Sequence, residues 1–330
     1  MIKLVFFGTG TLACSVLNAL IDASDIEILA LITQPDKPAG RGKKLQAPPI
    51  KKLTQHHELP ILQFPKLRDE AIEEIKKLGS DIFVVAEYGL LIPRAVLDLP
   101  AHGTLNVHPS LLPKYRGASP IQSAILAGEK ETGVSIMLLD EEMDHGPVLV
   151  QETLSIDDDD SAPTLEAKLG RLGAQLIAVA LPQWVAGKHE AKQQDHDSAT
   201  YCTKISRDDG RIDWNLSADE IYRRFRAYLP WPGIFTEWNG KRLKLTHISP
   251  PPSRGGGRGE GDQNKTPLPV PLPQGERGRT PGTIFLDGDK LYIATGDGTI
   301  VVDRLQLEGK KEMDAQAFMN GYSNFVDTIL

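Results

Sequence analysis

Residues 104–117 read TLNVHPSLLPKYRG, a short apolar strand that runs into a loop interrupted by prolines and a glycine. Side chains two residues apart on a strand point to the same face, so we expect Asn106 and His108 to project together from the strand's carboxyl end. In an open parallel sheet, ligands bind in the crevice outside the carboxyl ends of the strands. This stretch therefore predicts a sheet strand that places a polar pair where a ligand would lie.

Strand-like and helix-like segments alternate on both sides of this stretch. Strand patterns occupy residues 3–8, 27–33, 61–64, 81–87, 133–139 and 148–156, and helical patterns occupy 12–21, 50–55, 69–78 and 164–186. Such alternation is typical of a parallel sheet with helices on both faces. We therefore predict an α/β domain at residues 1–187, with a Rossmann-like, mostly parallel sheet.

A second domain is predicted at residues 207–330, after a polar linker at 188–206. Its pattern is a helix at 218–227, short strands with turn signals at Asn239-Gly240, Asp287-Gly288 and Asp297-Gly298, and a last helix from Ala315 capped by Asp314. Short strands joined by tight turns are typical of an OB-like β-barrel. An insertion at 250–281, rich in Pro, Gly and Arg, is predicted to be disordered and without function, with a nucleic-acid-binding arm as the alternative.

The composition, 40% hydrophobic and 25% charged, is that of an ordinary soluble globular protein. The sequence shows no long apolar run and no signal peptide, so we expect a cytoplasmic monomer that does not engage a membrane. The two cysteines, Cys14 and Cys202, lack the spacing of a disulfide framework or a zinc site. A net charge of -7 argues against generic polyanion binding, although a local basic patch can still hold a nucleic acid.

The first loop of the chain, residues 8–13, matches the pattern G-x-G-x-x-A directly after a strand, as in a dinucleotide site. The acid that this signature requires at the end of the second strand is missing, because the chain reads Ile32-Thr33-Gln34 there. On these residues alone, an NAD(P) site remains open beside the simpler interpretation of a tight turn that packs a helix on a strand.

Asn106, His108 and Asp144 form the strongest set of candidate catalytic residues. A neutral imidazole can accept or pass a proton near neutral pH, and a carboxamide can donate to an oxygen that becomes negative in a tetrahedral intermediate. Asp144, in the loop after the next strand, could orient His108 or take a proton. Together they predict an acyl-type transfer, and a metal site built from His108, Asp140, Asp144 and His145 is the alternative.

These residues stand in motifs that resemble the 10-formyltetrahydrofolate-dependent formyltransferases. The similar segments are Asn106 to Pro113, Tyr115-Arg116-Gly117, and Asp140 through Pro147. A basic loop at 34–49, in which neither strand nor helix periodicity continues, the segment 211–214 and the predicted barrel narrow the resemblance to the branch that acts on initiator methionyl-tRNA. The resemblance covers the chain apart from the insertion at 250–281.

The resemblance implies a role for each segment. Asn106, His108 and Asp144 are expected to be catalytic, and Ser110, Leu111, Leu112 and Pro113 to contact the folate. Arg41, Lys43 and Lys44 of the basic loop, together with Lys204, are expected to contact the tRNA. The implied reaction transfers the formyl group of 10-formyltetrahydrofolate to the α-amino group of methionyl-initiator-tRNA, giving N-formylmethionyl-tRNA for translation initiation. It uses no metal and no NAD.

The chain departs from the family's pattern at a few positions. Gly10 and Thr11 stand where the family more often has proline and an acid, Glu87 stands where it has a small apolar residue, and His145 stands where it often has threonine. Two other functions remain as hypotheses: formylation of an amino sugar or another small amine, and RNA binding by a catalytically idle protein on this fold.

Overall fold

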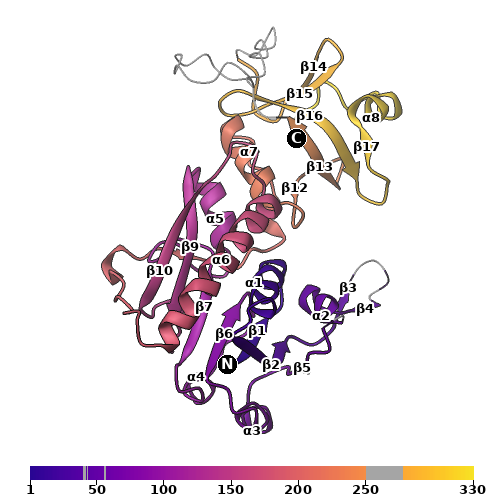
Figure 1. The fold of residues 1–330 in the computed structure, drawn as a ribbon. Coiled ribbons are helices and arrows are strands. Elements are labelled where there is room, and N and C mark those ends of the chain that lie inside the picture. Colours follow the sequence, from indigo (N-terminus) through magenta and orange to yellow (C-terminus); the bar gives the residue numbers. More distant parts are fainter. Residues whose placement is uncertain (40–41, 43, 56, 250–277) are drawn as a thin grey trace. The chain divides into compact units, whose positions relative to one another are not determined.

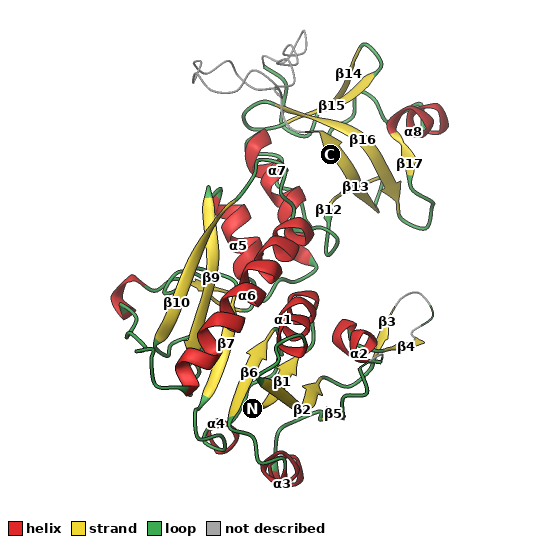
Figure 2. Ribbon diagram, viewed as in Figure 1, coloured by secondary structure: helices red, strands yellow, loops and turns green. Residues whose placement is uncertain are grey.

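The computed structural model describes residues 1–39, 42, 44–55, 57–249 and 278–330. The chain divides into two compact units, Met1–Lys204 and Ile205–Leu330. Figure 1 follows the chain through each unit, and Figure 2 distinguishes their helices from their strands. Within the described ranges, no helix is both long and apolar enough to cross a membrane.

The first unit is built on a seven-stranded sheet with the order β10-β9-β7-β6-β1-β2-β5. Its strands are β1 (Ile2–Gly8), β2 (Ile26–Thr33), β5 (Ile61–Gln63), β6 (Ile82–Ala86), β7 (Thr104–His108), β9 (Glu131–Leu138) and β10 (Val148–Ser155). The five neighbouring strands β7, β6, β1, β2 and β5 run parallel to one another, whereas β9 runs antiparallel to both of its neighbours, β7 and β10. The predicted mostly parallel sheet is thus confirmed.

Helices cover both faces of this sheet, as the alternating pattern predicts (Figures 1 and 2). They are α1 (Thr11–Ile21), α2 (Pro49–Thr54), α3 (Asp69–Lys77), α4 (Arg94–Leu97), α5 (Pro120–Ala127) and α6 (Ala162–Val185). Phe7 of β1 lies in a buried cluster with Ile75 of α3 and Val96 of α4. Gly173 of α6 lies so close to β7 that a Cβ there would come within 2.7 Å of Val107. Because Val107 faces α6, its neighbours on β7, Asn106 and His108, point to the other face.

The stretch predicted as a linker, residues 188–206, lies on the first unit over most of its length. Lys192 forms an isolated backbone bridge with Val148 of β10. Further on, β11 (Tyr201–Cys202) pairs in parallel with β8 (Arg116–Gly117). The first unit accordingly extends to Lys204, and this segment reaches the loops that carry the candidate catalytic residues.

The basic loop after β2 contains a short two-stranded sheet, although its Pro and Gly content had predicted no regular structure. The strands are β3 (Lys37–Ala39) and β4 (Lys44–Gln46), and Lys37 pairs with Gln46. Backbone pairing between the two ends of the loop needs no side-chain periodicity, which is why the sequence pattern did not reveal it. Arg41 and Lys43 lie outside the described residues.

The second unit combines an antiparallel sheet with α7 (Ala218–Ala227) and α8 (Ala315–Gly321). Its strands, in the order β12-β13-β16-β15-β14 with β17 paired to β16, are β12 (Ile234–Trp238), β13 (Lys241–Ser249), β14 (Ile284–Asp287), β15 (Lys290–Ala294), β16 (Thr299–Leu307) and β17 (Met313–Asp314). The predicted turns at 239–240, 287–288 and 297–298 each join paired strands. Asp314 caps α8 as predicted, accepting the Ala317 N–H at 2.7 Å.

An α/β domain followed by a β domain is thus confirmed. Of the insertion predicted at 250–281, residues 250–277 lie outside the described part of the chain.

Candidate active site

A cavity of about 490 Å³ opens in the first unit at the carboxyl ends of β6 and β7. This volume suits a small-molecule ligand. Asn106, His108 and Asp144 all line it, so the three residues predicted as catalytic meet at one site. The remaining wall is largely apolar and includes Val85, Leu90, Ile92, Leu97, Ile121 and Leu139.

His108 is almost fully buried, and its two ring nitrogens face different partners. Nε2 lies 3.0 Å from the carbonyl oxygen of Tyr115, which can only accept, so we assign the proton of the neutral ring to Nε2. Nδ1 lies 3.6 Å from Oδ1 of Asp144. In the neutral ring Nδ1 therefore has a free lone pair, and it lies beside a carboxylate that would stabilise the ring once Nδ1 is protonated.

Asn106 precedes His108 by two residues on β7 and is mostly buried in the same cavity wall. Among the residues that the structure describes, none forms a hydrogen bond with its carboxamide. An amide N–H that is not used inside the protein is available to an oxygen of a bound molecule.

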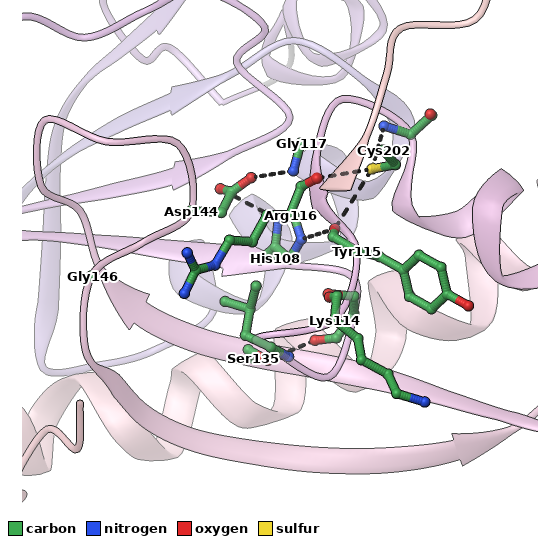
Figure 3. Close-up of polar contacts among 12 residues, drawn as sticks. His108, Lys114, Tyr115, Arg116, Gly117, Ser135, Asp144, Gly146 and Cys202 are labelled. Atoms are coloured by element: carbon green, nitrogen blue, oxygen red, sulfur yellow. Dashed lines mark hydrogen bonds and ion pairs between the residues drawn. The ribbon is translucent and has the colours of Figure 1, made fainter. Parts of the chain in front are cut away.

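A hydrogen bond to its carboxylate fixes the Asp144 side chain (Figure 3). Its Oδ2 accepts the backbone N–H of Gly117 at 2.7 Å, which leaves Oδ1 facing His108. Gly117 has φ +117°, and any Cβ there would lie 2.2 Å from the carbonyl oxygen of Cys202. Only glycine fits this position, and its N–H fixes the orientation of the Asp144 carboxylate.

The loop Ser110–Pro113, expected to contact the folate, does not line this cavity. Ser110 is fully buried and its hydroxyl donates to the Lys114 carbonyl at 2.6 Å. The Leu112 N–H donates to Ser135 Oγ of β9 at 3.1 Å, and the Leu112 carbonyl accepts from Gln151 of β10 at 2.8 Å. These contacts bind the loop to the antiparallel edge of the sheet, directly after His108.

Glu87 lies in the cavity wall just after β6 and interacts with the start of α1. Its Oε2 accepts the backbone N–H groups of Leu12 at 2.8 Å and Ala13 at 3.3 Å, groups that no residue within the helix can satisfy. A Cβ at Gly10 would lie 2.3 Å from this oxygen. The first turn of α1 has no acidic residue of its own, and Glu87 supplies a carboxylate to it instead. The departures from the family's pattern at positions 10, 11 and 87 are therefore linked. An acid directly after a buried strand, at its carboxyl end, is the signal that could have identified Glu87 as part of the site.

Glu87 should make stability depend on pH. Its pKa is raised to about 7, first by burial and then by Glu166, while the N–H groups of Ala13 and Leu12 oppose the rise. The folded protein keeps this proton to a higher pH than the unfolded chain, so the free energy of unfolding falls as pH rises from about 4.5 to about 7.

The Glu87 side chain lies deep in the protein but borders the cavity and is exposed there, so solvent screening reduces this loss to about 1 kcal/mol. We expect Glu87→Gln to reduce this fall in the free energy of unfolding, as measured by urea unfolding at about pH 5 and about pH 8. If the free energy of unfolding fell as much between these pH values in the variant as in the wild type, the assignment to Glu87 would be contradicted.

His145 and Asp140 lie beside the trio, and Nδ1 of His145 is 2.7 Å from Asp140 Oδ2. The alternative hypothesis combined these two residues with His108 and Asp144 as ligands of a metal. Among the described residues, no group of three or more His, Cys, Asp or Glu side chains is arranged to hold a metal ion.

The structure describes two of the four residues expected to contact tRNA. Arg41 and Lys43 lie outside the described residues. Lys44 is exposed on β4, and Lys204 is exposed at the end of the first unit. Both described side chains can therefore reach a partner in solution.

Two family models match the chain: formyl transferase over residues 2–181 and formyl transferase, C-terminal domain, over residues 204–323. The methionyl-tRNA formyltransferase of Myxococcus xanthus is 39% identical over 322 residues, which cover 97% of this chain and 95% of that protein. The methionyl-tRNA formyltransferase of Geobacter sulfurreducens is 36% identical over 323 residues, which cover 97% of this chain and 94% of that protein.

Solved structures share the fold at lower sequence identity. The N-formyltransferase of Helicobacter canadensis, solved with folinic acid and dTDP-3-aminofucose, has a TM-score of 0.62 at 18% identity and covers 92% of this chain and 99% of its own. HypX of Aquifex aeolicus with tetrahydrofolic acid has a TM-score of 0.61 at 17% identity, covering 99% of this chain and 48% of its own. At such identities the likeness extends to the fold alone.

Proposed function

Because this chain belongs to the methionyl-tRNA formyltransferases of the formyl transferase family, we propose that it transfers the formyl group of 10-formyltetrahydrofolate to the α-amino group of methionyl-initiator-tRNA. The observation that carries this proposal is the convergence of Asn106, His108 and Asp144 on one cavity at the carboxyl ends of the strands. The product is N-formylmethionyl-tRNA, the aminoacyl-tRNA that starts translation.

His108 acts as the proton carrier in this reaction. The α-amino group of esterified methionine, with a pKa of about 8 or lower, supplies a neutral nucleophile near neutral pH. As its nitrogen bonds to the formyl carbon, its proton moves to Nδ1 of His108, and the Asp144 carboxylate at 3.6 Å stabilises the resulting imidazolium. When the bond from the carbon to the donor nitrogen breaks, His108 returns the proton to that nitrogen, which gives tetrahydrofolate and the formylated amine.

Asn106 stabilises the charge that develops on the formyl oxygen. Addition of the amine turns the formyl group into a tetrahedral intermediate whose oxygen is negative, and the Asn106 amide N–H donates to it. The apolar part of the cavity wall lowers the local dielectric constant, which strengthens this contact.

The cavity that holds the trio is the binding site of the formyl donor. Its apolar wall, formed by Leu90, Ile92, Leu97 and Leu139, suits the flat ring system of a folate, and its polar residues lie at the reacting carbon. Ser110 to Pro113, which we expect to contact the donor, also act through their hydrogen bonds to β9 and β10, which fix the strand end that carries His108.

The tRNA is held by the basic loop and the second unit. Phosphate contacts by Lys and Arg supply affinity and register on a nucleic acid. Arg41, Lys43 and Lys44 supply such contacts from the loop, and Lys204 supplies one from the segment that leads into the second unit. The family match over residues 204–323 supports a substrate role for the second unit.

Arg41→Ala is expected to raise KM for methionyl-tRNA about three- to tenfold and to leave KM for the formyl donor unchanged, because one phosphate contact is lost. Steady-state kinetics with each substrate varied in turn measure both constants. Arg171→Ala, at an exposed arginine on α6, is the matched control and should change neither constant. Equal losses for both substrates in Arg41→Ala would show that the loop supports the fold rather than the RNA.

A competition assay tests the proposed function. The protein is incubated with 10-formyltetrahydrofolate labelled in the formyl group, methionyl-tRNA and a nucleotide-linked amino sugar. Label on methionyl-tRNA supports the proposal, whereas label on the sugar would identify an amino-sugar formyltransferase. Retained tRNA binding without transfer to either acceptor would identify an idle RNA-binding protein.

A further inference from the structure

We propose that Gln194, itself oriented by Arg116, is a positioning residue that holds Asp144 beside His108. Gln194 is buried, and its amide Nε2 donates to two carbonyl oxygens of the loop that carries Asp144. These are the carbonyl of Asp144 itself, at 2.9 Å, and that of Gly146, at 2.7 Å. The inference rests on the role proposed above for Asp144 and extends it to a residue in the segment after α6.

Arg116 determines which way the Gln194 amide faces. The Gln194 Oε1 accepts from Nη2 of Arg116 at 2.7 Å and from its Nε at 3.1 Å. A guanidinium can only donate, so the oxygen of the amide must lie toward Arg116. The NH₂ group is then directed to the two carbonyls, which can only accept, and the opposite amide orientation would break every one of these bonds.

Arg116 is 1% exposed and is itself held by other residues of the segment. Its Nη2 donates to Nδ1 of His196 at 2.9 Å, and its Nη1 donates to the hydroxyl of Tyr201 at 3.2 Å. The His196 ring also stacks on His145, with centroids 4.0 Å apart and planes within 5°. The loop next to the catalytic trio is thus held through its backbone by Gln194 and through His145 by His196.

Asp144 needs such support because of its backbone conformation. Its φ is +50°, a left-handed conformation that is uncommon for residues other than glycine, so the contacts around Asp144 help to maintain it. Without the bonds from Gln194, the Gly117 N–H would be the main restraint left on this residue. A displacement of Oδ1 by about 1 Å from the His108 ring is enough to slow a positioned reaction substantially.

Gln194→Glu tests this role, because a carboxylate still accepts from Arg116 but cannot donate to the two carbonyls. The chain offers a matched control in Gln193→Glu, the same change at an exposed neighbour. We expect Gln194→Glu to lower kcat about tenfold to a hundredfold, with both KM values within about twofold of the wild type. Gln193→Glu should behave as the wild type.

A double-mutant cycle with Asp144→Asn separates positioning from a general structural role. If Gln194 acts through Asp144, Gln194→Glu should lower kcat by less than about twofold in the Asp144→Asn background. An equal loss in both backgrounds, or a wild-type kcat for Gln194→Glu alone, would overturn the inference while the role of Asp144 stands. A wild-type kcat for Asp144→Asn alone would overturn the role of Asp144 itself, and with it the inference.

Tetrahydrofolate binding, measured by titration on every variant, shows whether the cavity has folded. If Gln194→Glu loses this binding, Gln194→Met takes its place in the cycle, since methionine has a similar length and cannot donate. The same outcomes then decide: a loss of kcat that disappears in the Asp144→Asn background supports the inference, and an equal loss in both backgrounds overturns it.

Discussion

Replacing Asn106 by alanine is expected to lower kcat about a hundredfold or more, because the tetrahedral intermediate loses an N–H donor to its negative oxygen. The loss should appear in kcat and not in KM for either substrate, since this hydrogen bond becomes strong only as the charge develops. Stopped reactions at saturating 10-formyltetrahydrofolate and methionyl-tRNA measure it.

The structure makes the Asn106 variant a clean test. No described residue forms a hydrogen bond with the carboxamide, so its removal leaves no internal donor or acceptor without its partner. We therefore expect Asn106→Ala to keep the melting temperature of the wild type and its affinity for tetrahydrofolate. A purified variant that formylates methionyl-tRNA at nearly the wild-type rate would refute the proposed stabilisation of the oxyanion.

The second large effect is expected for Asp144→Asn. The neutral amide keeps nearly the same shape, and its oxygen can still accept the Gly117 N–H, but it cannot stabilise a protonated His108. Loss of the group that stabilises the protonated general base costs on the order of a hundredfold in kcat or more. The same substitution at Asp158, an exposed residue paired with Lys130 at 2.8 Å, is the matched control.

Steady-state kinetics on both variants measure this effect. We expect Asp158→Asn to keep the kcat of the wild type, and a wild-type kcat for Asp144→Asn would contradict the role proposed for Asp144.

Local patterns revealed Asn106 and His108 because they are two apart on one strand and so share a face at its carboxyl end. Asp144 does not follow from strand geometry in the same way, because β9 runs antiparallel to β7 and ends beside the amino end of β7, so the loop after β9 must return toward His108. Gln194 could not be found in this way. It stands in a polar stretch that resembles a linker, and its partners Asp144 and Gly146 lie far away in the sequence.

The loop after His108 shows a second limit of sequence reasoning. The motif at Ser110–Pro113 was recognisable, yet nothing in its composition indicates that the Leu112 N–H donates to Ser135 of β9. The apolar residues that do line the cavity, such as Leu90 and Ile92, look like ordinary core residues in the sequence. Which of several apolar segments faces a ligand is decided by tertiary structure.

The contact between Glu87 and the start of α1 has a consequence for how this protein can change during evolution. A helix amino terminus of this kind attracts anions such as phosphate, and here a carboxylate from the same chain occupies it. A side chain at position 10 would displace that carboxylate, whereas loss of the carboxylate would remove an acceptor from the Leu12 and Ala13 N–H groups. Positions 10 and 87 therefore form an epistatic pair, in which the effect of a substitution at one position depends on the residue at the other.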